Sequence, residues 1–172
     1  FTGFALIKEP VYPVQRTSES LKVMLKRAMG LVRINPNFRR LLVSRAILGV
    51  GVALAPFYVL HARQIVPTDA GVIGVFLAAQ MTGAALSNIL WAWLADTRGN
   101  KTVIVGTIAS SGLASGLALL LPSFAPAAYA VVFVLMGAML SGMRIGFNNF
   151  ILEMAAPEMR ATCVALQNTL IA

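Results

Sequence analysis

Residues 71–120 read GVIGVFLAAQMTGAALSNILWAWLADTRGNKTVIVGTIASSGLASGLALL. The charged residues of this stretch, Asp96, Arg98 and Lys101, all lie in the turn D-T-R-G-N-K at 96–101. Each uncharged segment beside the turn is close to the roughly 20 apolar residues that a helix needs to cross a bilayer. A turn this short makes the two helices antiparallel. The stretch therefore predicts a helical hairpin that spans a membrane.

The rest of the chain has the same apolar character. Of its 172 residues, 58% are hydrophobic and only 12% are charged, whereas a soluble domain is about 45–50% apolar and about 25% charged. Hydropathy predicts complete spans at about 41–61, 70–95, 102–121 and 125–152, and the start of a fifth at 161–172. The predicted fold class is all-α, a polytopic transmembrane helix bundle over residues 36–172.

The segment before the first span has a different composition. Residues 1–7 are apolar, and we expect them to be the end of a preceding transmembrane helix in a longer protein. Residues 8–35 are predicted to be a basic cytoplasmic linker. Within it, residues 17–33 have helical periodicity with one apolar and one basic face. Such a helix either lies in the headgroup plane or packs between two halves of a larger protein. Asn35 and Pro36 then predict a helix N-cap and first-turn proline.

The distribution of charge predicts the orientation in a cell membrane. The formal net charge is +8, and eight of the fourteen basic residues lie in residues 1–40. Arg98, Lys101 and Arg160 lie in turns on the same predicted side, against Arg63 alone on the other. Because positive charge is retained on the cytoplasmic side, the N-terminal segment is predicted to be cytoplasmic. A basic segment ahead of an apolar body also indicates a lipid surface rather than nucleic acid as its partner.

The turn motif A-W-L-A-D-T-R-G-N-K at 92–101 resembles the signature loop of the major facilitator superfamily, roughly G-x-L-A-D-R-x-G-R-K. It departs from that pattern at Ala92, Thr97 and Asn100. The resemblance implies a cytoplasmic latch turn formed by Asp96, Arg98, Gly99 and Lys101. Glycine at position 99 permits the positive backbone dihedral of a tight turn, and the Asp96 carboxylate is suited to cap the next helix or to pair with a cation.

Three further segments resemble the same family. They are N-P-N-F-R-R-L-L at 35–42, similar to the entry to the first helix of the second half; A-P-F-Y at 55–58, similar to a break in that helix; and P-E-M-R at 157–160, similar to a later cytoplasmic turn. The resemblance implies helices seven to ten and the start of eleven of a twelve-helix secondary transporter. Such a protein moves a small solute by alternating access between two halves. The N-terminal half would then be the partner of this chain.

Arg45 and Arg144 lie within predicted spans, where an ionisable side chain is a candidate functional group. Arg144 is about 12 Å from the predicted cytoplasmic end of its helix at 1.5 Å per residue, and Asn148 follows one turn later. On one reading, Arg144 faces a water-filled cavity and pairs with an anionic substrate or with a carboxylate of the other half. On the other, its long side chain extends to the cytoplasmic headgroups.

Gln80, Tyr58 and Gln167 are further substrate-path candidates. Each glutamine is equally suited to bond a neighbouring helix. Tyr58 is either an interfacial aromatic residue or is turned toward the cavity by the break at Pro56. His61 is predicted to be a surface residue at the membrane edge rather than a proton carrier.

Small residues predict close helix packing at two pairs, Gly112 with Gly116 and Gly142 with Gly146. The single cysteine, Cys163, lies in an apolar stretch and is predicted to be a packing residue. No aspartate or glutamate lies in the middle of a predicted span, so if transport is coupled to protons, the titrating carboxylate is expected in the other half.

The sequence has no pattern of catalytic, metal-ligating or nucleotide-binding residues. We therefore expect no enzyme activity, metal or cofactor. Two other classes remain as alternatives to a transporter. One is a small multi-span membrane protein with an assembly or structural role, and the other is a membrane-embedded enzyme of lipid metabolism.

Overall fold

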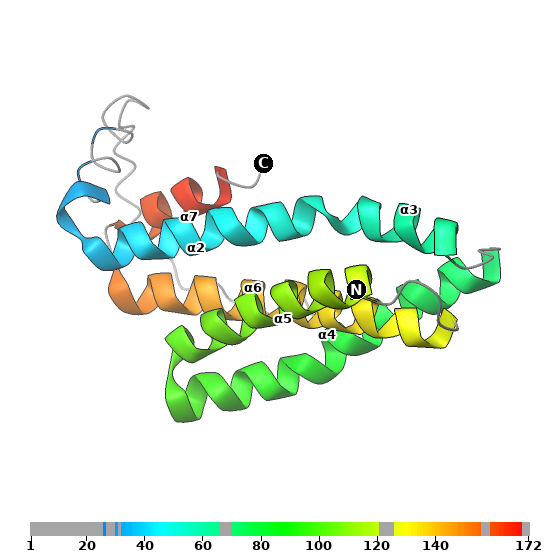
Figure 1. Cartoon of the computed structure of the whole chain (residues 1–172). Coiled ribbons are helices and arrows are strands. Elements are labelled where there is room, and N and C mark those ends of the chain that lie inside the picture. The colour runs from blue at the N-terminus through cyan, green and yellow to red at the C-terminus, as the bar shows by residue number, and fades with distance from the viewer. Residues whose placement is uncertain are drawn as a thin grey trace, which may run out of the picture.

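The computed structural model confirms an all-α fold. It describes residues 26, 30, 32–65, 70–120, 126–155 and 159–169, and no strand occurs among them. Residues 1–7, most of the predicted linker and residues 170–172 lie outside the described part of the chain. The helices (Figure 1) are α2 (Pro36–Ala53), α3 (Ala55–Ile65), α4 (Ala70–Arg98), α5 (Asn100–Leu120), α6 (Pro126–Met154) and α7 (Arg160–Thr169).

Four helical stretches are long and apolar enough to cross a membrane. They are Pro36–Gln64, Gly71–Arg98, Asn100–Leu120 and Tyr129–Met154. Large apolar side chains also cover the outside of the bundle, including Ile89, which is 72% exposed, and Leu86, which is 65% exposed. An apolar surface of this kind is stable in lipid and unfavourable in water. The chain is therefore a multi-pass membrane protein.

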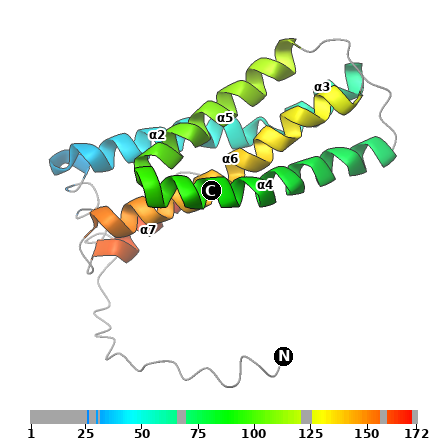
Figure 2. The same cartoon turned by 90° about the horizontal axis from the view of Figure 1, so that it is seen from below.

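Helix α6 lies at the centre of the bundle. It packs most extensively against α4 and α5, and it also contacts α2 and α7 (Figure 2). Its buried residues include Val132, Phe147 and Ile151, which are fully enclosed. The chain runs so that α2 and α5 begin, and α4 and α6 end, at one end of the bundle (Figure 1). We call this the Gly99 end.

The first predicted span consists of two helices. Asn35 caps α2, because its side-chain Oδ1 accepts hydrogen bonds from Asn37 N at 3.0 Å and Phe38 N at 3.2 Å. Pro36 occupies the first turn, where its missing N–H is not needed. Both predictions for this cap are confirmed. The helix thus begins five residues before the predicted span start at 41.

A break at Leu54 separates α2 from α3. Phe57 N donates to Leu54 O at 2.9 Å, an i to i−3 bond that tightens the turn. Pro56 follows the break and has no N–H with which to continue the α-helical bonding from Val52. The predicted break at A-P-F-Y is therefore confirmed.

A single residue, Gly99, joins α4 to α5. Its φ is +81°, a left-handed conformation that glycine adopts without steric cost, as predicted. Gly99 N donates to Ala95 O at 3.0 Å and closes the last turn of α4. The helix thus continues through Asp96 and Arg98, beyond the predicted boundary at residue 95.

The closest helix crossing joins α4 to α6 at glycines that the sequence patterns did not indicate. A Cβ at Gly137 would collide with the carbonyl oxygen of Gln80, and one at Gly83 with the carbonyl oxygen of Val134. The predicted pair Gly142 and Gly146 also packs closely, against α4 and α5 side chains.

The other predicted close pair, Gly112 with Gly116, makes no close contact within the described part of the chain, where no atom lies within 4 Å of a Cβ built at either residue. A four-residue glycine spacing allows close approach, but it does not fix which helix face turns toward a neighbour. Cys163, as predicted, is a buried packing residue.

Candidate functional site

A cavity of about 370 Å³ lies between α2, α6 and α7. It contains two cationic side chains, Arg45 from α2 and Arg144 from α6. Its lining residues are Arg45, Met143, Arg144, Asn148, Leu152, Val164 and Asn168. The cavity thus combines two guanidinium groups and two amides with an apolar wall, and none of the lining residues that the structure describes is a carboxylate.

Arg45 occupies a position on α2 where its neighbours are apolar. The buried face of the helix carries Phe38, Leu41 and Leu48 at helical spacing on either side of it. Arg45 is only 9% exposed, and its Nε and Nη1 atoms are buried without a hydrogen-bond partner. Its Cζ lies over the ring of Phe147 at 5.0 Å from the centroid, a cation–π contact. The ring stabilises one face of the guanidinium and leaves its N–H donors free.

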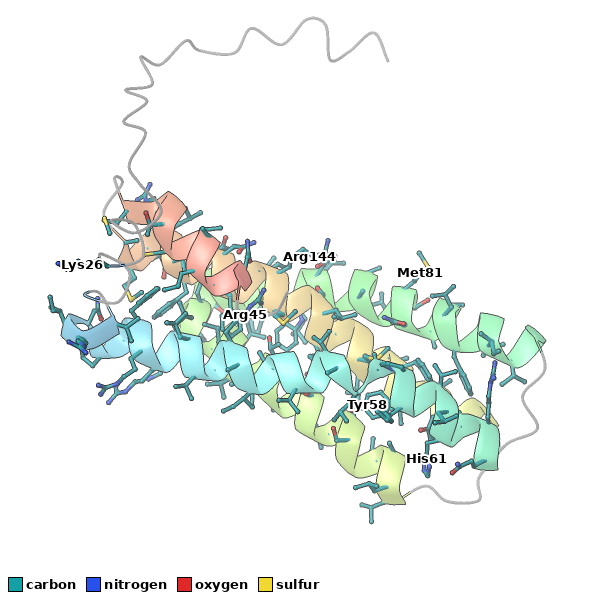
Figure 3. All side chains as sticks on the ribbon, turned by 90° about the horizontal axis from the view of Figure 1, so that it is seen from above. Lys26, Arg45, Tyr58, His61, Met81 and Arg144 are labelled. Atoms are coloured by element: carbon teal, nitrogen blue, oxygen red, sulfur yellow. The ribbon has the colours of Figure 1, made fainter. Side chains whose placement is uncertain are left out.

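Arg144 approaches the same cavity from the surface of α6. It is exposed, and in the described part of the chain it forms no ion pair. At 1.5 Å per residue, Arg45 is about 14 Å from the start of α2, and Arg144 is about 15 Å from the end of α6. Both helix ends belong to the Gly99 end, so the arginines lie at nearly equal depth. Figure 3 shows them at similar positions along the bundle.

Two other predicted site residues meet beside this cavity. Gln167 of α7 is fully buried, and its Nε2 donates to Asn148 Oδ1 at 3.1 Å. Gln167 Oε1 is buried without a partner. Asn148 lines the cavity, and while its oxygen accepts from Gln167, its Nδ2 donors carry no hydrogen bond to the described residues and are available to a ligand. The fold therefore brings Arg144, Asn148 and Gln167 together.

Tyr58 does not join this site. It is buried nearer the opposite end of the bundle (Figure 3), where its hydroxyl lies 2.8 Å from Ser115 Oγ of α5. Tyr129 donates its hydroxyl proton to the Tyr58 carbonyl at 3.2 Å. These bonds connect α3 to α5 and α6, and Tyr58 is not among the residues that line the cavity.

Gln80 and His61 also lie away from the cavity lining. Gln80 is half-buried at the α4–α6 crossing, where its carbonyl faces Gly137. His61 is half-buried, not the surface residue that we expected. Its Nε2 lies 3.0 Å from the carbonyl oxygen of Ala118. A carbonyl only accepts, so this ring nitrogen donates its proton and ties α3 to the end of α5.

The predicted latch turn has a polar contact that the sequence did not indicate. Asn100, at a position where the family pattern has arginine, is buried, and its Nδ2 donates to Glu153 Oε1 at 2.6 Å. This bond joins the start of α5 to the end of α6. Asp96 is exposed and lines a groove of about 320 Å³ with these two residues. Among the described residues, Asp96 makes no ion pair.

Arg45 lies within the first predicted span but was not among the predicted substrate-path residues. A sequence signal was present, since Arg45 falls on the apolar stripe of Phe38, Leu41 and Leu48.

Comparison with protein-family models, curated proteins and solved structures finds no match to this chain. Within the described ranges, no group of three histidine, cysteine, aspartate or glutamate side chains is placed to hold a metal ion. The site is a cationic cavity rich in N–H donors, and it lies between three helices of a membrane protein.

Proposed function

We propose that the protein is a secondary transporter that moves a small solute across the cell membrane by alternating access. One observation carries this proposal: the buried and unpartnered Arg45 beside a cavity within a bundle of membrane helices. A charged group in this environment is costly, and in membrane proteins such groups commonly mark solute or ion pathways. A purely structural subunit gains nothing from an arginine at this position, where an apolar residue would pack.

We further propose that the chain forms most of the C-terminal half of a major facilitator superfamily transporter. The motif at 92–101 supports this assignment, and Gly99 has the positive φ that its tight turn requires. In this proposal, residues 8–35 and the Gly99 end are cytoplasmic. A second half, provided by another part of the protein, would face the cavity and close it alternately from each side.

The break at Leu54 suits such a cycle. Helix α3 is tied to α5 through Tyr58 and His61, whereas α2 carries Arg45 into the cavity. The interruption at Leu54 is a place where α2 would bend relative to α3, although α2 also packs against α5. Movement of α2 against α6 would then change access to the cavity.

Cysteine accessibility tests alternating access without knowledge of the solute. Cys163→Ser removes the only cysteine of this chain, and Asn148→Cys then places a thiol in the cavity lining. The intact protein, otherwise free of cysteine, is reconstituted in oriented proteoliposomes and treated with a membrane-impermeant maleimide from one side at a time. We expect Asn148→Cys to react from both sides, because each of the two states opens the cavity to one of them.

Leu86→Cys provides the matched control. Leu86 lies on the exposed apolar face of α4, and a thiol in hydrocarbon does not ionise to the reactive thiolate. We expect it to react from neither side. Reaction of Asn148→Cys from one side only would contradict alternating access and favour an assembly or structural role. Uptake of labelled solutes into the same vesicles would then identify the cargo.

A further inference from the structure

We infer that the cavity binds a small solute through an oxyanion group, a carboxylate or phosphate, held by Arg45 and Arg144. This inference rests on the proposed transport function, because it names the class of solute for the same site. It depends on three features of the described residues: the charge of the cavity, the free donors of Arg45 and the polarity of the neighbouring amides.

The charge of the cavity requires an anion. Arginine stays protonated in proteins, so the lining carries two positive charges. Among the described residues no carboxylate lines the cavity, and Glu153, which lies closer to the Gly99 end, is bonded to Asn100. A buried cation without a counter-charge is strongly unfavourable. An anionic ligand that enters from water would supply the missing charge only when it is bound.

The geometry of Arg45 selects the kind of anion. Phe147 covers the face of the guanidinium, so hydrogen bonds are left to form in its plane. Nε and Nη1 are buried without a partner, and Nη2, which forms a parallel donor pair with either of them, carries no hydrogen bond to the described residues. Parallel N–H donors in that plane match two oxygens of one carboxylate or phosphate. A halide ion would use only one point of this fork. The geometry therefore favours an oxyanion.

The neighbouring amide strengthens this preference. Asn148 Oδ1 accepts from Gln167, and the Nδ2 group of Asn148 carries no hydrogen bond to the described residues, so its N–H donors are available to a ligand. The remaining wall is apolar, with Met143, Leu152 and Val164. A cavity of about 370 Å³ suits a small organic anion whose short carbon chain contacts this wall.

Thermal unfolding of the purified intact protein tests the inference. In a neutral detergent, we would titrate potassium phosphate, sulfate and succinate against potassium chloride at equal ionic strength. We expect at least one oxyanion to raise Tm in a saturable manner, and chloride to leave it unchanged. Arg45→Gln should weaken this response at least about tenfold, because it removes one partner of a buried charge pair.

Two further variants distinguish anion binding at this cavity from a general effect of the anions on Tm. Arg45→Lys keeps the charge without the planar fork, so we expect an intermediate loss; it also replaces Arg45→Gln if that variant does not fold. Arg39→Gln removes an exposed arginine of α2 outside the cavity lining and should respond as the wild type does. A Tm unaffected by all three oxyanions, or an equal response in Arg45→Gln and the wild type, would overturn the inference.

A lipid headgroup is the other source of a phosphate oxyanion. The same measurement in nanodiscs of phosphatidylcholine, with and without phosphatidylglycerol, distinguishes the two sources. A Tm increase from phosphatidylglycerol without one from soluble anions would reject the solute. Failure of this inference is separable from failure of the transport proposal, because anion binding and two-sided labelling of Asn148→Cys are measured independently.

Discussion

Arg45 is surrounded by groups that suit an apolar side chain. Phe38, Leu41 and Leu48 share its face of α2, and the Phe147 ring lies against it. The position is thus shaped like a core site, and the charge is the one feature that packing does not explain. Arg144, at nearly the same depth, differs because it is exposed and has other ways to be solvated. The two arginines should therefore respond differently to neutralisation.

Arg45→Met is expected to raise the free energy of unfolding of the anion-free protein by about 1–3 kcal/mol, because an apolar group of similar length removes an unpaired buried charge. Chemical denaturation in phosphate-free neutral detergent would measure this, with Arg144→Met as the comparison, for which we expect a smaller effect. A loss of about 3–5 kcal/mol for Arg45→Met would instead mean that a carboxylate elsewhere in the protein pairs with Arg45.

At the scale of elements, backbone contact between α4 and α6 fixes the centre of the bundle. Gly83 and Gly137 let each helix reach the other's carbonyl oxygens, of Val134 and Gln80. Trp91 adds a side-chain tie across the same pair, since its Nε1 donates to Ala138 O at 2.9 Å. Close backbone approach of this kind is a main source of helix association in lipid, where burial of apolar surface gives little driving force.

Gly137→Ala and Gly116→Ala are expected to have opposite effects on stability. The added methyl at 137 collides with a carbonyl oxygen and should cost about 1–3 kcal/mol. The methyl at 116 meets open space, so higher helix propensity should leave stability unchanged or raise it by up to about 1 kcal/mol. Denaturation of both variants in detergent tests this, and equal losses would contradict the crossing.

Much of this arrangement follows from local sequence. Apolar lengths predict the four long helices, Asn35 with Pro36 predicts the start of α2, and the D-T-R-G-N-K turn predicts Gly99. Each of these depends on neighbouring residues only. Arg144 and Asn148 were also predictable as a pair, because four residues form one helical turn.

The remaining features depend on which helix faces meet. His61 is half-buried because the end of α5 lies beside it, and Gly137 is a contact because α4 crosses α6 there. The bond from Asn100 to Glu153 likewise joins residues far apart in the chain. Local patterns carry little information about such pairings: the sequence indicated the close packing of Gly142 and Gly146 but not that of Gly83 and Gly137.

In the whole molecule, α6 lies at the centre, so most of the other described helices pack against it. It contacts α2, α4, α5 and α7. Small movements of α6 would therefore reach the cavity, the α4 crossing and the Asn100 contact together. Movements at the cavity and at the Gly99 end would therefore be coupled through α6.

If the transport proposal holds, the two arginines of the cavity also make its conformational equilibrium depend on the membrane potential. An empty cavity carries two positive charges, and a bound dianion cancels them. A charge that crosses the full field changes energy by about 2.3 kcal/mol per 100 mV. A negative interior should therefore hold the empty carrier open to the cytoplasm, so labelling of Asn148→Cys from that side should increase with an imposed potassium diffusion potential. Arg45→Gln should reduce this dependence, and a wild-type labelling rate independent of potential would contradict it.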